Sequence, residues 1–304
     1  MKTFYRILIC VAALATMSAL VSCNKDKNGK DSDVTFKVPA QKTNAQKFVF
    51  TETAEKIVYE DSSVNGEVQS IDNTAEGRSI IVVKERSKAA GDFVTVISSF
   101  TYTDGKWVIK GLGTIELKDG GKVAFTDADN NTIEVPATVV EPLTGTAADN
   151  LCRLWKIEST TFVAKGGQLS NAGVGTTFTG EDASSAQAIA NYFKNNSDGK
   201  INITENLSGY DIKTIEVTDG GSLVIEFANE PSFVAEIKNF KAGEFKYELV
   251  AGNGNDVINA EANGKVEFAG TADSPRCRFT IIGKIVNGST TYTTNIEFVL
   301  VKKA

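Results

Sequence analysis

Short runs of alternating apolar and polar residues, separated by turn dipeptides, are the feature that most constrains the fold of this 304-residue chain. Side chains in a β-strand point alternately to the two faces of a sheet, so these runs predict half-buried strands. Asp-Gly begins at Asp104, Asp119, Asp198 and Asp219, and Asn-Gly begins at Asn65, Asn253, Asn263 and Asn287. Both dipeptides accept the positive backbone angles of tight hairpin turns. The sequence therefore predicts an all-β, mainly antiparallel fold of barrels or sandwiches.

The predicted strands fall into two series. The first series comprises Lys47–Phe50, Lys56–Tyr59, Ser79–Val83, Phe93–Tyr102, Lys106–Ile109, Thr114–Leu117, Lys122–Phe125 and Thr132–Val135. The second comprises Leu154–Thr161, Lys200–Ile203, Ile212–Val217, Ser222–Phe227, Phe233–Ile237, Phe245–Val250, Gly264–Phe268, Arg278–Val286 and Thr291–Val301. Between them, Pro142–Asn150 has the composition of a linker. We therefore expect two β-rich domains, at residues 34–145 and 150–304.

One segment departs from the strand pattern. Within Glu181–Asn195, Ala186, Ile189, Ala190 and Phe193 recur at helical spacing. The sequence predicts one short α-helix here. Such a helix either covers the mouth of a barrel as a lid or packs on the sheet.

The two series also share a local sequence. Thr114-Ile115-Glu116 followed by Asp119-Gly120-Gly121 is repeated 100 positions later as Thr214-Ile215-Glu216 followed by Asp219-Gly220-Gly221. One interpretation is that the two domains arose by duplication. The other is that two unrelated hairpins share the same turn chemistry.

Composition excludes several classes of function. The chain has no histidine, which removes Ser-His-Asp and Cys-His catalytic sites and every His-based metal site. Its 32 basic and 38 acidic side chains give a net charge of −6, which disfavours a nucleic-acid partner because phosphates would be repelled. We expect a protein that is not an enzyme and that carries no cofactor.

The N-terminal residues indicate export. Lys2 and Arg6 precede an apolar run, Ile7–Leu20, that is too short to span a bilayer comfortably. The ending Leu20-Val21-Ser22-Cys23 resembles the bacterial lipoprotein signal. That resemblance implies cleavage of residues 1–22, acylation of Cys23 and a lipid anchor in the outer membrane, facing either the periplasm or the exterior. Residues 23–33, which contain no apolar residue after Cys23, are expected to form a solvated tether.

Two cysteines remain in the body of the protein, Cys152 and Cys277. Each lies in a strand-like run with arginine next in sequence. An exported compartment permits a disulfide between them. The alternative is two separately buried thiols that pack as small apolar groups.

Few side chains are candidates for ligand contacts. Trp107 and Trp155, the only tryptophans, either present rings to a sugar or apolar ligand or pack inside a barrel. The oxygen-rich segment Asp127–Glu134 lacks the glycine and the glutamate spacing of a calcium-binding EF-hand loop. A hairpin tip explains that segment, so no metal site is predicted.

The second half resembles the lipocalin-like lipoproteins. Leu151-Cys152-Arg153-Leu154-Trp155-Lys156-Ile157-Glu158 is similar to their opening strand, which has a tryptophan at the barrel base, although Arg153 stands where a glycine is usual. The resemblance implies a closed barrel that binds a small apolar molecule. We therefore expect a membrane-anchored binding protein for a small apolar molecule or a glycan. The alternatives are an envelope component that assembles by pairing through Tyr292–Val301, and a carboxylate-based glycan hydrolase.

Overall fold

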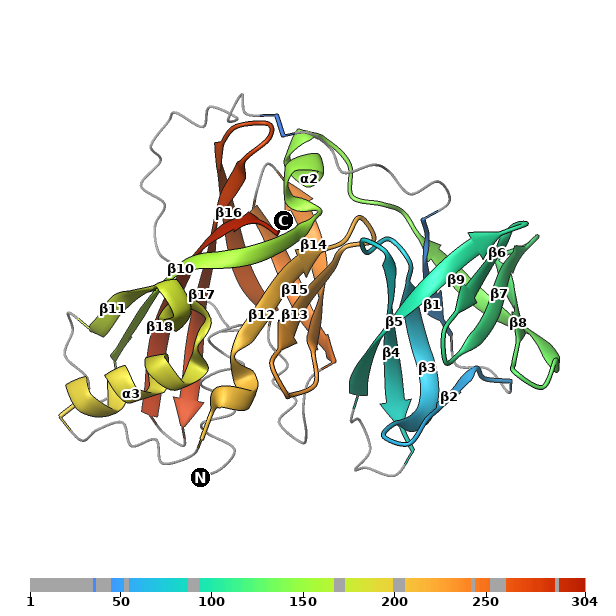
Figure 1. Cartoon of the computed structure of the whole chain (residues 1–304), viewed down its shortest axis with the longest axis horizontal. Coiled ribbons are helices and arrows are strands. Elements are labelled where there is room, and N and C mark those ends of the chain that lie inside the picture. The colour runs from blue at the N-terminus through green and yellow to red at the C-terminus, as the bar shows by residue number, and fades with distance from the viewer. Residues whose placement is uncertain are drawn as a thin grey trace.

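The computed structural model describes residues 35–36, 45–51, 55–86, 93–166, 173–198, 206–241, 244–251, 261–287 and 290–303. Residues 1–34, with Cys23, and the predicted strand Lys200–Ile203 lie outside the described residues. The chain forms two nine-stranded antiparallel sheets that lie side by side along the long axis of the molecule (Figure 1). The prediction of an all-β fold with two β-rich parts is confirmed.

The first sheet closes on itself. Its strands are β1 (Lys47–Phe50), β2 (Val58–Glu60), β3 (Asn65–Asp72), β4 (Arg78–Glu85), β5 (Phe93–Thr103), β6 (Lys106–Ile109), β7 (Gly113–Lys118), β8 (Lys122–Thr126) and β9 (Thr132–Val140). Strands β3 to β9 each pair with the next, and β1 pairs with both β9 and β3. Strand β2 continues the line of β1 along the same edge of β3. The result is a barrel with the β1–β2 break in its wall.

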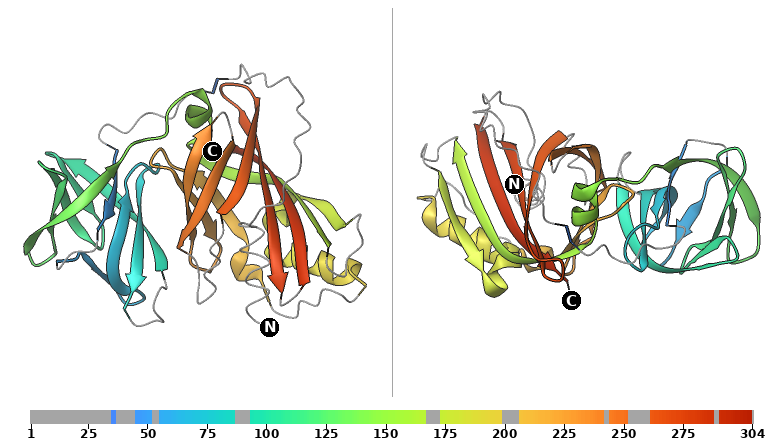
Figure 2. Two further views of the ribbon diagram at one scale, coloured as in Figure 1. Left: turned by 180° about the vertical axis from the view of Figure 1, so that it is seen from behind. Right: turned by 90° about the horizontal axis from the view of Figure 1, so that it is seen from above.

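The second sheet is an up-and-down barrel of the kind that the resemblance implied. Its strands are β10 (Leu154–Gly166), β11 (Val174–Thr179), β12 (Ile212–Val217), β13 (Ser222–Phe227), β14 (Phe233–Lys241), β15 (Glu244–Ala251), β16 (Glu261–Gly270), β17 (Pro275–Asn287) and β18 (Thr290–Lys302). Strands β12 to β18 pair in sequence order, and β18 returns to pair with β10. The view from above shows this curved wall beside the first barrel (Figure 2). Strands β11 and β12 share the other edge of β10.

Alternation along the strands fills both interiors with side chains. In β6, for example, Trp107 and Ile109 are buried while Lys106 and Val108 are exposed. The first core contains Phe48, Ile71, Trp107, Ile115 and Val123, and the second contains Trp155, Phe162, Phe233, Phe279 and Phe298. Burying one such side chain contributes about 1.5–3 kcal/mol, so these inward rows are what hold each barrel closed.

Helices lie at both ends of the second barrel. The predicted helix is present as a 3₁₀ turn, η1 (Gly180–Ser184), followed by α3 (Ala186–Asn196). The hydroxyl of Ser185 accepts a hydrogen bond from the Ala188 N–H and caps the start of α3. A second helix, α2 (Thr146–Leu151), occupies part of the segment that the sequence predicted as a linker. It forms because Ala148 and Leu151 are buried in the second core, so packing decides its conformation.

Two of the predicted turns are wrong. Asn65-Gly66 starts β3, and Asn263-Gly264 lies inside β16, where it pairs with both β15 and β17. Gly66 is needed for close approach rather than for a turn, because a Cβ there would lie 2.2 Å from the backbone oxygen of Lys84. Asp104-Gly105, by contrast, has positive φ at both residues, as a tight hairpin turn requires.

The repeated Thr-Ile-Glu to Asp-Gly-Gly sequences form hairpins at different places in the two barrels. The first copy is β7–β8, next to the last strand of its barrel, and the second is β12–β13, next to the opening strand β10. Their turns also differ, since Gly120 and Gly121 both have positive φ while in the second copy only Gly221 does. The geometry favours shared turn chemistry over duplication.

Phe36 packs in the second barrel although it precedes the first in sequence. Its ring is 1% exposed and meets Phe268 edge-on at 5.8 Å between centroids. Its N–H donates to Oδ1 of Asn150 over 2.9 Å, and the Arg153 guanidinium lies 5.3 Å from the ring centroid. Residue 36 therefore packs with the second domain rather than with the predicted first domain, residues 34–145.

Candidate functional site

An apolar pocket lies between α3 and the wall of the second barrel. Its lining includes Phe162, Ile189, Tyr210, Ile212, Ile296 and Phe298. The cavity volume is about 30 Å³. All the empty space between the lining atoms, with the open side of the pocket included, totals about 470 Å³. The pocket is therefore narrow in this conformation, with room for the end of a chain rather than for a bulky ring system.

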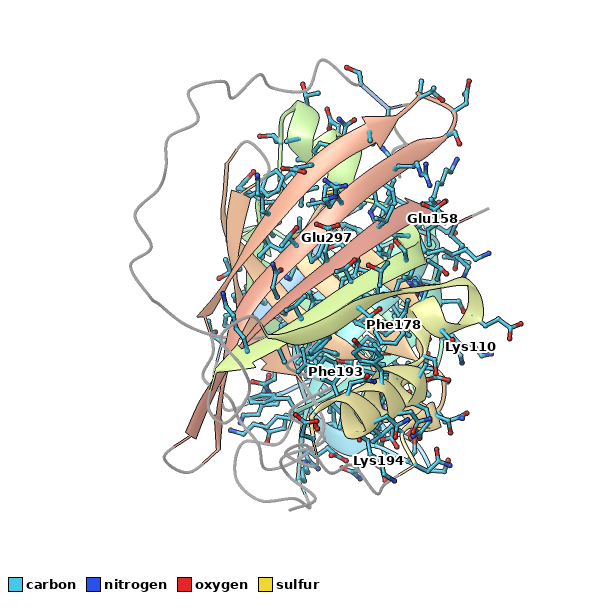
Figure 3. All side chains as sticks on the ribbon, turned by 90° about the vertical axis from the view of Figure 1, so that its left-hand side faces the viewer. Lys110, Glu158, Phe178, Phe193, Lys194 and Glu297 are labelled. Carbon is cyan, nitrogen blue, oxygen red and sulfur yellow. The ribbon has the colours of Figure 1, made fainter. Side chains whose placement is uncertain are left out.

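Small residues on the helical side keep this pocket open. Ala183, Ala186 and Ala190 face the barrel where larger side chains would meet Phe162 and Phe298. The larger residues of α3 pack to one side, with the Phe193 and Phe162 rings 4.9 Å apart between centroids. Figure 3 shows Phe178 and Phe193 between sheet and helix, and Lys194 on the outer side of α3.

Hydrogen bonds fix the helical segment to the barrel. Thr160 on β10 donates its hydroxyl to the backbone oxygen of Ala183 in η1. The N–H of Ala186, at the start of α3, donates to Oδ1 of Asp211 over 2.8 Å. Tyr192 donates its hydroxyl to the backbone oxygen of Gly175 on β11, also over 2.8 Å. These bonds hold the wall of the pocket at three points.

A second concentration of polar side chains joins the two barrels. Asp72, at the end of β3, is 1% exposed. Its Oδ2 accepts hydrogen bonds from the hydroxyls of Thr218 and Ser222, each over 2.7 Å. Lys47 on β1 is equally buried and forms an ion pair with Glu236 on β14. We call this contact, with the groups in the next paragraph, the domain interface.

Arg78 is the central cation of the domain interface. Its Nη2 lies 2.6 Å from Oε2 of Glu216, and its Nη1 lies 2.9 Å from Oε2 of Glu226. Burial lowers the pKa of Arg78, but the two carboxylates outweigh this and raise it on balance. Burial raises the pKa of Glu226, while hydrogen bonds from Thr214 and Arg78 lower it to below its ordinary value. Arg78 and Glu226 therefore carry full charges at neutral pH, so they hold the two barrels together and do not transfer protons.

An apolar cluster lies beside these charges. It comprises Ala75, Ile80 and Val82 from the first barrel and Val224 and Val234 from the second. The interface between the two barrels thus combines buried ion pairs with a small hydrophobic contact.

Both predicted ligand-contact tryptophans are core residues. Trp107 is 3% exposed and Trp155 is 0% exposed. Trp107 packs against Phe48, and the Trp155 Nε1–H donates to the backbone oxygen of Leu151 over 2.9 Å. They are buried because each stands at an inward position of its strand. Neither ring offers a face on which a sugar could stack.

Cys152 and Cys277 are free, buried thiols, so the structure has the second of the two predicted arrangements. Burial raises the pKa of both thiols, and the negative charge of Asp219 adds to the effect at Cys152. Cys152 donates its thiol to the backbone oxygen of Thr218 over 3.4 Å. Arg153 follows it in sequence and stacks over the Trp155 ring at 5.6 Å. Both cysteines act as packing residues in the second core.

The remaining predicted features do not form a site. Asp127 accepts hydrogen bonds from the N–H groups of Asp129 and Asn131, which closes the β8–β9 hairpin and leaves the carboxylate engaged. Among the described residues, no three potential metal-binding side chains gather. The terminal strand β18 pairs with both β17 and β10, so both edges of Tyr292–Val301 are occupied within the barrel.

The carboxylates that meet at the domain interface do not form a hydrolase dyad. Glu216 is 1% exposed, and Arg78 forms ion pairs with both Glu216 and Glu226. A carboxylate engaged with Arg78 is not free to serve as the acid or base of a dyad, and Glu216 is out of reach of a substrate.

Sequence reasoning missed the pocket and the domain interface. The alanines of α3 were recognised only as one face of a helix, and Arg78 stood just before the predicted strand Ser79–Val83. In the described part of the chain, no helix is both long and apolar enough to cross a bilayer. Comparison of the chain with models of protein families, with curated proteins and with solved structures finds no match.

Proposed function

We propose that this chain is a lipid-anchored, non-enzymatic envelope protein whose second barrel binds a narrow apolar group in the pocket beside α3. The observation that carries the proposal is the apolar lining of that pocket, which Phe162, Ile212, Ile296 and Phe298 provide. A closed barrel with a side chain-lined pocket is a common binding architecture. The burial of both tryptophans favours an apolar ligand over a glycan.

The size of the pocket restricts the ligand. Each buried methylene contributes about 0.8 kcal/mol, so an end of three or four methylenes gains about 3 kcal/mol. That corresponds to binding weaker than millimolar. Micromolar affinity would need about ten buried methylenes, for which α3 must move away from the barrel. We therefore favour the end of an acyl chain or a similar linear group.

The anchor rests on the N-terminal sequence. Leu20-Val21-Ser22-Cys23 supports cleavage before Cys23 and acylation of that residue. The outer membrane is the destination we propose. Replacing Cys23 with alanine should release the protein from membranes, and retention of that variant in detergent-free membrane fractions would refute the anchor.

Native mass spectrometry of the protein purified from its own envelope tests ligand binding. The anchor-free form, residues 23–304 with Cys23→Ala, should carry a co-purifying apolar molecule. It should also bind cis-parinaric acid, a naturally fluorescent fatty acid that can enter by the end of its chain. Ala190→Leu fills the pocket from α3 and should abolish both signals. Asn195→Leu places the same new side chain on the exposed face of the same helix and should leave them unchanged. Equal binding by the two variants would refute the pocket as the site.

A further inference from the structure

Phe36 connects the N-terminal segment to one particular end of the second barrel. Its partners are Asn150 in α2, Arg153 just before β10, and Phe268 near the end of β16. These contacts bury the ring and satisfy its backbone N–H. We call this set of contacts the Phe36 anchor point.

The Phe36 anchor point and the pocket lie at opposite ends of the barrel. Strand β10 begins at Leu154 beside α2, and its pocket residues Thr160 and Phe162 come six and eight residues later. At about 3.3 Å per residue, that places them roughly 20–26 Å along the strand. Helix α3 lies farther in the same direction, whereas residues 35–36 and α2 lie at the other end (Figures 1 and 2).

Phe36 comes thirteen positions after Cys23 in the sequence. A chain of that length reaches about 45 Å when fully extended, and a flexible chain of that length has an average span of about 20 Å. A lipid on Cys23 therefore keeps the Phe36 anchor point about 20 Å from the bilayer on average and no more than about 45 Å from it. The far end of the barrel has no such constraint.

We propose that the α2 end of the second barrel faces the bilayer surface and that the pocket beside α3 points away from it. This inference rests on the proposed lipid anchor. The membrane-facing surface comprises α2, the β16–β17 turn and the end of β18. The ligand would then enter from the aqueous side rather than from the membrane that holds the protein.

Fluorescence quenching of the lipidated protein tests this orientation. A fluorophore is placed on Asp273→Cys in the β16–β17 turn or on Lys194→Cys on α3, both exposed positions. The buried Cys152 and Cys277 do not compete for the label. In phosphatidylcholine vesicles with nitroxide-labelled headgroups, we expect at least about twofold stronger quenching at residue 273. Equal quenching, or stronger quenching at residue 194, would overturn the orientation.

Two further variants separate the orientation from its premises. Phe36→Ala should bring the quenching ratio close to one. Because that variant also removes a buried ring and so lowers stability, a second one inserts about twenty Gly-Ser residues before residue 35 and leaves the anchor point intact. The insertion should lower quenching at residue 273 and should reduce the ratio of quenching at residue 273 to quenching at residue 194. An unchanged ratio would count against the tether as the cause of the orientation. Failure of the lipidated protein to bind vesicles would refute the anchor itself, whereas binding with equal quenching refutes only the orientation.

Discussion

Replacing Arg78 with methionine should uncouple the two barrels. Methionine keeps much of the aliphatic stem but removes the three hydrogen bonds that Arg78 donates, two to Glu216 and one to Glu226. The Glu216 side chain is 2% exposed, so it cannot recover hydration in place. The N–H of Glu76 would still donate to it.

The expected loss of stability is large. Leaving one member of a buried ion pair without its partner costs about 3–5 kcal/mol. Because Arg78 is 17% exposed and Glu226 is 24% exposed, solvent reduces the effect, and we expect about 3 kcal/mol. Arg276→Met is the matched control, since Arg276 pairs with Glu158 at the surface, where both side chains are over 40% exposed. That substitution should cost less than about 1 kcal/mol.

Tryptophan fluorescence during urea unfolding can follow each barrel by itself, because Trp107 lies in the first core and Trp155 in the second. In Trp107→Phe and Trp155→Phe forms of the anchor-free protein, the two transitions should coincide while Arg78 is present. With Arg78→Met they should separate, and at least one midpoint should fall. Adding Glu216→Leu to Arg78→Met should recover part of the loss. If Arg78→Met behaves like Arg276→Met, with coincident transitions, the domain interface does not couple the barrels in the way argued above.

Two further predictions concern titratable groups outside the interface. In the anchor-free protein, Cys152 and Cys277 should not react with Ellman's reagent in the native state, because burial raises the pKa of both thiols. Two reactive thiols should appear when urea unfolds the chain. Reaction in the native state would contradict their burial. The Asp61 carboxylate accepts hydrogen bonds from the N–H groups of Ser63 and Val64, so it should titrate by NMR with a pKa of about 2. Its stabilisation of the β2–β3 turn is complete above the ordinary pKa and is lost as the pH falls towards 2. A titration midpoint near 4 would refute those bonds.

Most of the fold was predictable because short stretches of sequence determine where its strands and turns lie. Alternation and turn dipeptides locate the majority of the strands, and Asp104-Gly105 is an example, since both residues have the positive φ that a tight hairpin turn requires. Asn65-Gly66 is also a dipeptide typical of hairpin turns but lies in a strand, where Lys84 on the neighbouring strand approaches it closely. Helix α2 was missed for a related reason, since Ala148 and Leu151 are stabilised by a core that the local sequence does not reveal.

The candidate site depends on contacts between distant segments, so the sequence alone did not show it. The pocket requires β10, β18 and α3 to meet, and the side chains that line it are ordinary core residues. Arg78 and Glu216 are 138 positions apart. Trp107 and Trp155 drew attention because tryptophan is rare in this chain, but their inward strand positions already favoured burial.

The contacts of Phe36 also set an order for the folding of the chain. The first barrel can close once β9 has been made, since all of its strands precede residue 141. Phe36 must wait longer, because Asn150 lies 114 positions away and Phe268 on β16 comes still later. Contacts between such distant residues form slowly, since a long loop must close first. Phe36 therefore stays free of the body while the first barrel folds, and it becomes fixed only when the second barrel is almost complete.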